Sequence, residues 1–441
     1  MKYIYGLNKS GQSIIKYLNL IKENYYCWDN NERTRNKLMK LDRNINLVKP
    51  ENINLKSINE LFVTPGVALN NNNLNFLKHD NIKFYRDLEL YSRIAKDKKI
   101  IAITGTNGKS TTTKLISDVL KKGKIKNFKG GNIGIPLLDF TKKNNEIKHH
   151  VIELSSFQLE SFNAFKPFIS VLLNIVPDHL DRYKNYEDYA FQKEKIIISN
   201  KNNFNIVCID YKKNLEIYNR YKKKIIPISK DFLKYGIYFK DDYIVDNYFK
   251  IKKNIKLSSL SLSLFGTFNI ENIMAAYVVS RILNIRTKDF IDVLAKFKGL
   301  PHRLENIYKN KKLQVINNSK ATNLYATLNA ILNYENIYLI LGGREKEKNF
   351  KKILNYHNKI IKIYLIGEST ELIFQQLKNK IVCEKCENLE TATTKIFFDI
   401  KRKKVFNTVL FSPACTSFDQ FKNFEERGNV FKKIIRKHFN E

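Results

Sequence analysis

The 441-residue sequence contains few of the residues that break or cross-link a chain, with 16 Gly, 8 Pro and 5 Cys. So little Gly and Pro excludes a collagen-like or low-complexity chain. The odd number of scattered cysteines argues against a disulfide framework and favours a reducing compartment. Cys383 and Cys386 form a CxxC pair, but no second Cys or His pair stands at the spacing of a structural zinc site. We therefore interpret this pair as a coincidence.

Long apolar runs are also missing. No run approaches the roughly 18 apolar residues that span a bilayer. The first residues, MKYIYGLNKSGQS, lack the apolar stretch of a signal peptide. We expect a soluble, cytoplasmic protein with no membrane partner.

Acidic residues are in deficit, because 43 Asp and Glu stand against 78 Lys and Arg, a net charge of +35. Such an excess is typical of proteins with a polyanionic partner. The surplus is mostly Lys, however, and it runs through the whole chain together with many Asn, Ile and Tyr, the residues of A/T-rich codons. We interpret it as compositional drift that favours phosphorylated ligands, and we expect no specific nucleic-acid partner.

The remaining composition, 43% hydrophobic and 27% charged, is that of a globular protein of two to four domains. The N-terminal pattern is a strand over 2–5, a Gly-containing turn over 6–11, a helix, and a strand over 25–28 that ends at Asp29. This order, with an acidic residue about 20 positions after the glycines, is typical of a nucleotide-binding βαβ unit.

From residue 100 the pattern restarts with a strand over 100–103, a Gly-rich loop and a helix from Ser110. Alternating strands and helices predict a mostly parallel sheet with its active loops at the carboxyl ends of the strands. The segment 210–262 gives little signal, and a third α/β block begins near 299. The further strands are expected at 61–63, 151–154, 170–175, 205–209, 313–316, 337–341, 361–366 and 408–411.

The strongest motif is TGTNGKST, residues 104–111, between a strand and a helix. Backbone N–H groups and a helix N-terminus can surround phosphate oxygens there, Lys109 can neutralise the β and γ phosphates, and the Ser110 hydroxyl can bind Mg²⁺. Ile103 stands where the general pattern GxxxxGK[ST] has its first Gly, so the loop is a shortened variant.

This loop resembles the ATP loop of the Mur ligase superfamily, which also includes folylpolyglutamate synthases. The motif ELSSFQLE at 153–160, Asn174, the motif DHLDR at 178–182 and Lys193 resemble central-domain features of that family. Four C-terminal motifs are similar to its D-glutamate-adding branch, and the tail at 424–429 continues the match. They are GLPHR (299–303), NNSKATN (317–323), LGGREK (341–346) and SPACTSFDQF (412–421).

The resemblance covers nearly the whole chain and implies an α/β protein of three domains. These are a Rossmann-like UDP-substrate domain (1–95), a central P-loop ATPase-like domain with a parallel sheet (96–298) and a C-terminal Rossmann-like D-glutamate domain (299–441). The implied activity is that of an ATP-dependent acid–amino-acid ligase of the EC 6.3.2.9 type. It joins D-glutamate to UDP-N-acetylmuramoyl-L-alanine through an acyl phosphate in peptidoglycan precursor synthesis. We expect a monomer that uses ATP, two Mg²⁺ ions and a CO₂-derived carbamate on Lys193.

The resemblance also implies roles for individual residues. The expected catalytic residues are Lys109, Glu153, His179 and Lys193, and the expected metal ligands are Ser110, Glu153, His179 and the carbamate of Lys193. The expected ATP-binding residues are Gly105, Thr106, Asn107, Gly108, Lys109, Ser110, Thr111, Asn269, Asn272, Arg303 and Asn318. The expected UDP-substrate residues are Gly6, Lys9, Ser10, Gly11, Asp29, Thr64, Pro65, Gly66, Asn132, Gln158 and His179. The expected D-glutamate residues are Lys320, Thr322, Lys346, Ser417, Phe418 and Phe424.

Three positions depart from the family pattern. Asn8 stands where the family has Gly, Phe268 where it has His, and Asn318 where it has Asp. We interpret these changes as drift with retained function. Two alternatives stay open: another amide ligase of the superfamily, such as a folylpolyglutamate synthase, and a non-catalytic basic protein that binds nucleic acid.

Overall fold

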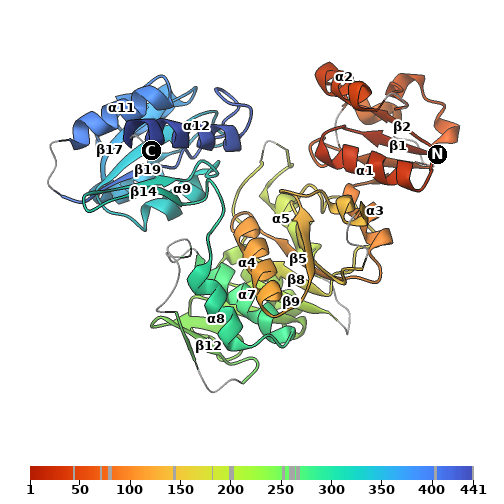
Figure 1. Ribbon diagram of the computed structural model, residues 1–441, viewed down its shortest axis with the longest axis horizontal. Coiled ribbons are helices and arrows are strands. Elements are labelled where there is room, and N and C mark those ends of the chain that lie inside the picture. Colours follow the sequence, from red (N-terminus) through yellow and green to blue (C-terminus); the bar gives the residue numbers. More distant parts are fainter. Residues whose placement is uncertain are drawn as a thin grey trace. The chain divides into compact units, whose positions relative to one another are not determined.

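The computed structural model describes residues 1–42, 45–69, 72–77, 82–142, 146–180, 182–197, 203–250, 254–257, 264, 269–401 and 405–439. Within them the chain forms three β-sheets with helices packed against them, which confirms the predicted α/β class (Figure 1). Two compact units result, Met1–Ser258 with Glu271–Val293, and Ser259–Ile270 with Leu294–Glu441. The first unit contains two sheets and the second contains one. The domain boundaries at 95 and 298 stay predictions.

The N-terminal sheet is parallel in the order β2-β1-β3-β4. Its strands are short and largely buried, and apolar side chains of α1 pack on one face while those of residues 53–82 pack on the other. The elements are β1 Lys2–Tyr5, α1 Lys9–Leu20, β2 Tyr25–Trp28, α2 Glu32–Leu41, β3 Glu60–Val63, β4 Lys83–Tyr85 and α3 Asp87–Ile94.

The central sheet has the order β13-β12-β11-β10-β9-β8-β5-β7-β6 and is parallel except for the pairs β11–β12 and β12–β13. Its core is continuous with the core under α1 and α3, so these two sheets share one unit. The elements are β5 Lys99–Thr104, α4 Lys109–Lys122, β6 Asn127–Gly131, β7 His149–Glu153, β8 Ile169–Leu172, α5 Tyr186–Glu194, β9 Phe204–Cys208, α6 Lys212–Tyr221, β10 Ile225–Ser229, β11 Ile237–Lys240, β12 Tyr243–Asp246, β13 Ile255–Lys256, α7 Ile270–Ile282 and α8 Thr287–Lys296.

The C-terminal sheet has the order β14-β15-β19-β16-β17-β18, with only β14 antiparallel to its neighbour in the described chain. Side chains of α9 and α10 cover one face and those of α11 and α12 cover the other. The elements are β14 Glu305–Lys309, β15 Leu313–Asn317, α9 Leu324–Ile331, β16 Ile337–Gly342, β17 Ile360–Ile366, α10 Thr370–Leu377, β18 Cys383–Lys385, α11 Leu389–Ile400, β19 Asn407–Phe411 and α12 Phe424–Phe439.

Most of the predicted strands are present, with ends that shift by one or two residues. The strand predicted over 170–175 is wrong at its end, because β8 stops at Leu172 and Asn174 turns into a loop. The turn predicted over 6–11 is shorter than expected, since α1 begins at Lys9. The segment 210–262 holds β10, which the sequence did not reveal because Pro227 lies within it.

Cys383 is the first residue of β18 and Cys386 directly follows the strand. The two side chains pack into different apolar clusters, Cys383 into the cluster under α10 and Cys386 into the cluster under α11. One metal ion cannot bind two thiols on opposite faces of a sheet. This placement agrees with the interpretation of the pair as coincidental. Within the described segments no helix is long and apolar enough to cross a bilayer.

His150 is a buried titratable group in the core of the first unit. Its ring lies 4.8 Å from the Phe140 ring and 5.1 Å from the Phe128 ring, and its Nδ1 is 2.9 Å from the Tyr91 hydroxyl. Burial lowers the pKa of His150 to about 4. As the pH falls below about 6.5, the unfolded chain therefore takes up a proton that the folded chain does not, and stability is lost.

We expect this one residue to cost about 2 kcal/mol of stability between pH 7.5 and pH 5. His150→Phe removes the titrating group but leaves the Tyr91 hydroxyl without this partner. The variant should therefore unfold at a lower temperature at pH 7.5, with a smaller further drop at pH 5. Thermal unfolding at both pH values measures this, and His357→Gln, at an exposed position, is the control. An equal pH-dependent drop in the wild type and in His150→Phe would contradict the prediction.

Candidate active site

The predicted phosphate loop connects β5 to α4. Gly108 has a φ of +83°, and a Cβ there would lie 2.4 Å from Asn272 Oδ1, so only Gly fits. The Lys109 ammonium donates to the carbonyl oxygens of Gly105 and Thr106, both at 2.8 Å. A cation therefore lies over a Gly-rich loop at a helix N-terminus, an arrangement suited to phosphate. Ser110 and Thr111 follow in the first turn of α4.

Asn174, which follows β8, anchors this loop. Its Oδ1 accepts from the Asn107 amide at 2.8 Å, and its own carbonyl oxygen accepts from the Thr106 amide at 2.7 Å. Its Nδ2 donates to the Asn107 carbonyl at 3.2 Å and to Glu271 Oε1 at 2.6 Å. The position of the loop is thus connected, through one amide side chain, to a carboxyl group on α7.

Glu271 is a residue that the sequence analysis missed. It is buried, burial raises its pKa to about 7, and the Cys208 thiol donates to its Oε2 at 3.5 Å. The signal for Glu271 in the sequence is its position between Asn269 and Asn272, two predicted ATP-binding residues. A fully buried Glu is rare unless it is paired, but the sequence alone does not show that Glu271 is buried.

Glu153 is the last residue of β7 and is 2% exposed. The Ser110 hydroxyl donates to its Oε2 at 2.5 Å, and Asn132 Nδ2 donates to its Oε1 at 3.0 Å. The carboxylate thus joins the phosphate loop to a predicted substrate residue. Carboxylate and hydroxyl oxygens are ligands that Mg²⁺ prefers.

The described residues gather no group of three His, Cys, Asp or Glu side chains that could hold a metal ion. The protein oxygens near Glu153 would therefore supply only part of a Mg²⁺ coordination shell. Mg²⁺ commonly completes its shell with substrate phosphates and water, so the residues present fit this ion.

Lys193, on α5, is 1% exposed and donates to the Gly105 carbonyl at 2.9 Å. Burial, followed by the charge of Lys109, holds the pKa of its amine well below the usual value, although Asp178 and Glu153 act in the opposite direction. The predicted catalytic groups Lys109, Glu153 and Lys193 thus lie within electrostatic reach of one another. A neutral amine is the form that adds CO₂, so the site also fits a carbamate.

His179 lies in the loop after β8 with a left-handed φ of +55°. Its ring stands edge-on to Phe157 with 4.8 Å between centroids, and its Nε2 is 3.6 Å from an Asp178 carboxylate oxygen. The loop therefore fixes the orientation of the imidazole. The roles of His179 in catalysis, metal binding and substrate binding stay predictions.

The first predicted UDP-substrate loop is closed by Asp29. This carboxylate accepts from the Leu7 amide at 2.7 Å and from the Asn31 amide at 2.9 Å. A Cβ at Gly11 would lie 2.0 Å from the Gly6 carbonyl oxygen, so the helix can approach the turn only with Gly there. Asp29 therefore supports the turn directly.

The departure at Asn8 does not disturb this turn. Asn8 has φ −72° and ψ −167°, an extended conformation that any residue adopts. Lys9 follows it as the exposed first residue of α1.

Of the predicted substrate residues, Gln158 donates from its Nε2 to Asp87 Oδ2 at 3.3 Å. Ser10 lies in the first turn of α1. Burial raises the pKa of Asp87, and its second oxygen has no hydrogen-bond partner in the described structure. The sequence analysis did not select Asp87, whose burial at the start of α3 no local pattern indicates. The remaining predicted residues, Thr64, Pro65 and Gly66, follow β3 directly.

The predicted D-glutamate residues follow the carboxyl ends of adjacent strands in the second unit. Lys320 and Thr322 follow β15, Lys346 follows β16, and Ser417 follows β19. The Lys320 ammonium lies 3.9 Å from the centroid of the Phe424 ring, at the start of α12. Ser417 is buried, whereas Lys346 is exposed and Phe418 is 62% exposed. Their binding roles stay predictions.

Arg427, on α12, is a third residue that the sequence analysis left out of the site. It is 1% exposed and donates to the carbonyls of Ser319 (2.8 Å), Cys415 (3.1 Å) and Thr416 (3.0 Å). Burial lowers its pKa to about 10. One guanidinium thus joins the loop with Lys320 to the loop that precedes Ser417.

The side-chain amide of Asn318 makes hydrogen bonds to two other segments of the second unit. Its Nδ2 donates to the Ser412 hydroxyl at 3.0 Å and its Oδ1 accepts from the Leu304 amide at 3.2 Å. A carboxylate could not donate the first of these bonds. Two other predicted ATP-binding residues are Arg303, which precedes Leu304, and Asn269, which is buried and directly precedes α7. Their contacts with ATP stay predictions. Phe268 lies outside the described residues.

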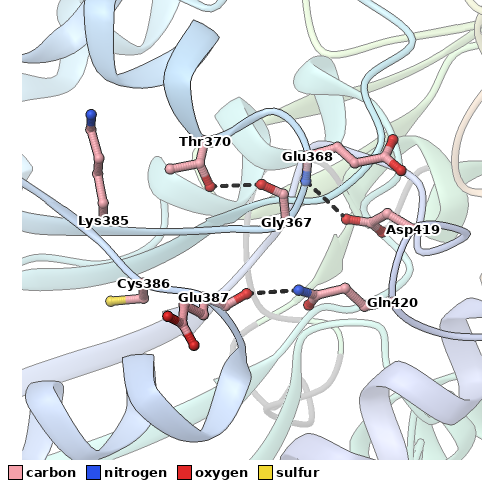
Figure 2. Close-up of a pocket in the computed structure, with 8 residues that line it drawn as sticks. All are labelled: Gly367, Glu368, Thr370, Lys385, Cys386, Glu387, Asp419 and Gln420. Atoms are coloured by element: carbon pink, nitrogen blue, oxygen red, sulfur yellow. Dashed lines mark hydrogen bonds between the residues drawn. The ribbon is translucent and has the colours of Figure 1, made fainter.

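A pocket of about 610 Å³ lies near the carboxyl ends of β17 and β18 (Figure 2). Its polar groups bond to one another: Thr370 Oγ1 donates to the Gly367 carbonyl at 2.8 Å, the Glu368 amide to Asp419 at 3.2 Å, and Gln420 Nε2 to the Glu387 carbonyl at 2.7 Å. None of the predicted site residues lines it. The function therefore rests on the loops described above.

Comparisons with known proteins identify the family of the chain. Residues 103–280 match the family described as Mur ligase middle domain. A protein of Rickettsia prowazekii named UDP-N-acetylmuramoylalanine–D-glutamate ligase is 36% identical over 443 residues, which cover 99% of this chain and 98% of that protein. The chain belongs to the D-glutamate branch of the Mur ligase family.

Other relatives support the same placement. A protein of the same name from Wolbachia sp. subsp. Brugia malayi is 33% identical, over 98% of this chain and 95% of that protein. Solved Mur ligases share the fold at lower identity. MurF of Thermotoga maritima in complex with ADP has a TM-score of 0.62 at 18% identity, over 99% of this chain and 98% of that one. MurC of the same organism has a TM-score of 0.61 at 18% identity, over 100% and 99%.

The contact between Glu271 and Asn174 yields a prediction about ATP. Glu271→Leu leaves the Asn174 amide without its shortest bond, and an unsatisfied buried donor costs about 1–3 kcal/mol. We expect the KM for ATP to rise at least about tenfold, because the loop loses its support. Glu271→Gln retains an acceptor oxygen and should stay close to the wild type.

Steady-state kinetics with each substrate varied in turn measure these changes. The KM for D-glutamate should not change, because its predicted residues lie on other strands. Equal KM values for ATP in the Leu and Gln variants would show that the bond to Asn174 does not support the loop.

Proposed function

We propose that the protein is an ATP-dependent ligase that joins D-glutamate to UDP-N-acetylmuramoyl-L-alanine in peptidoglycan precursor synthesis. The observation that carries the proposal is the convergence of Lys109, Glu153 and Lys193 at the phosphate loop of a chain in the D-glutamate branch. The free cysteines fit a reducing compartment, and we propose that the protein acts as a monomer in the cytoplasm.

The reaction needs activation, because a free carboxylate is a poor electrophile at neutral pH. The L-alanyl carboxylate attacks the γ-phosphorus of ATP, the bond to the β-phosphate oxygen breaks, and ADP leaves. The amine of D-glutamate then attacks the acyl phosphate, and phosphate leaves as the peptide bond forms. The amine loses one proton in this second step, and the leaving phosphate takes it up, so that the products are the amide and HPO₄²⁻.

The chain's own residues stabilise charge in the first step. The Lys109 ammonium, with the α4 N-terminus, neutralises the negative charge on the transferred phosphoryl group. Ser110 and Glu153 are the oxygen ligands that would hold Mg²⁺. Two Mg²⁺ ions would supply electrostatic stabilisation of the phosphoryl oxygens. Lys193 as a carbamate would contribute an anionic ligand where the unmodified ammonium would repel a metal ion.

D-glutamate carries two carboxylates, which need cationic and hydroxyl donors. Lys320 and Lys346 supply the charges, and Thr322 and Ser417 supply the hydroxyl groups. The buried Arg427 holds two of the loops that carry them. We propose that these residues bind the amino acid, while the residues around Asp29 and Asp87 bind the UDP-substrate.

The test is phosphate release by the purified protein with ATP, Mg²⁺ and UDP-N-acetylmuramoyl-L-alanine. We expect release that requires D-glutamate and is not supported by L-glutamate. Release with a folate substrate and L-glutamate would favour the folylpolyglutamate synthase alternative. Salt-dependent DNA binding with no ATP turnover would favour the nucleic-acid alternative.

A second prediction separates D-glutamate recognition from the rest of the site. Lys346→Ala should raise the KM for D-glutamate about tenfold or more, because it removes a charge that pairs with a carboxylate. The dissociation constant of the UDP-substrate should stay within about twofold. Lys348→Ala, two residues away and also exposed, is the matched control. A KM that changes equally in both variants would place Lys346 outside the binding site.

A further inference from the structure

Arg86 is a fully buried arginine that has no role in the site described above. It directly precedes α3 and is 0% exposed. Its NH1 group donates to the carbonyl oxygens of Val63 at 3.0 Å, Thr64 at 2.8 Å and Val67 at 2.9 Å. These carbonyls belong to the end of β3 and the loop that follows it.

A second guanidinium binds the same loop. Arg182 donates to the Pro65 carbonyl at 2.8 Å and to the Val67 carbonyl at 3.0 Å. Glu160 pairs with both cations, with Arg86 directly and with Arg182 at 3.2 Å. Segment 63–67 thus receives five hydrogen bonds from two arginines that lie elsewhere in the chain.

The same cluster reaches the segment that carries His179. The Arg182 guanidinium lies 3.8 Å from the centroid of the Phe157 ring, which also contacts the edge-on His179 imidazole and the Tyr183 ring. The Tyr183 hydroxyl donates to Glu160 at 3.1 Å. A change at Glu160 would therefore act both on the loop after β3 and on the loop with His179.

Arginines bind segment 63–67 on one side, and the other side of the segment is open at Gly66. Its carbonyl oxygens are bound by arginine, whereas a Cβ added at Gly66 would meet no atom within 4 Å. Gly66 and its neighbours Thr64 and Pro65 are the residues expected to contact the UDP-substrate. An open face on a segment held in place from behind is a preorganised binding surface.

We propose that Arg86 is a positioning residue for the UDP-substrate, acting with Arg182 through Glu160 to fix segment 63–67 before the ligand arrives. The inference rests on the proposed function, because that function names the ligand. Lysine would replace either arginine only in part, since a single ammonium keeps the charge but cannot reproduce a planar fork that reaches several carbonyls and a carboxylate together.

The experiment compares Arg86→Met and Arg86→Lys with the wild type. We expect the KM for UDP-N-acetylmuramoyl-L-alanine to rise at least about tenfold in the Met variant and less in the Lys variant. The KM values for ATP and D-glutamate should stay within about twofold. Arg93→Met is the matched control, because Arg93 lies on α3, which Arg86 directly precedes, and pairs with Glu60 and Glu89 but not with the carbonyls of the segment.

Arg182→Lys serves as the second variant if Arg86 variants do not fold, because Arg182 is 12% exposed. Calorimetric titration with the UDP-substrate, without ATP, should give a dissociation constant at least about tenfold higher than that of the wild type. An unchanged constant, or an equal rise of all three KM values, would overturn the inference. Calorimetry needs no turnover, so a wild type that binds the UDP-substrate but releases no phosphate refutes the proposed activity and leaves this test valid.

Discussion

The substrate loops depend on one constraint. The backbone carbonyl groups that follow the last residues of the strands have no partner in a sheet and need hydrogen-bond donors from elsewhere. A loop at the carboxyl end of a parallel strand must find donors for these groups if it is to stay in one place. In this protein, buried or half-buried cations supply many of these donors. Lys109 and Lys193 bind carbonyls of the phosphate loop, Arg86 binds those after β3, and Arg427 binds those after β15 and β19.

This arrangement links stability to chemistry. A buried cation without acceptors would be very costly, so each one requires its loop to present carbonyl oxygens in one arrangement. Lys193 has a single carbonyl partner at 2.9 Å and a strongly lowered pKa, so it is the least firmly held as a cation. That is the property a carbamate site needs, because only the neutral amine reacts with CO₂. Arg427, with three carbonyls, remains a structural cation.

The sequence allowed the sheets and the main loops to be predicted, because buried parallel strands such as 100–103 and 337–341 appear as continuous apolar runs, and the phosphate loop has a local motif. It did not allow Asp87 or Glu271 to be predicted. Their importance comes from burial and from partners such as Asn174, more than 90 residues away from Glu271 in the chain. Likewise, β10 was missed because Pro227 interrupts its pattern, although all five of its residues are buried.

The composition gives an independent reason to regard the buried arginines as important for the position of the loops. The surplus of positive charge is mostly Lys, and on solvated faces the two residues are nearly equivalent as charges. They are not equivalent where several acceptors converge, because the guanidinium offers five donors in a fixed plane and the ammonium offers three on a flexible stem. Arg86, Arg182 and Arg427 each bind two or three carbonyl groups, while Lys193 binds one. At these three positions the geometry requires the guanidinium fork, and the positions show which loops must be held in place.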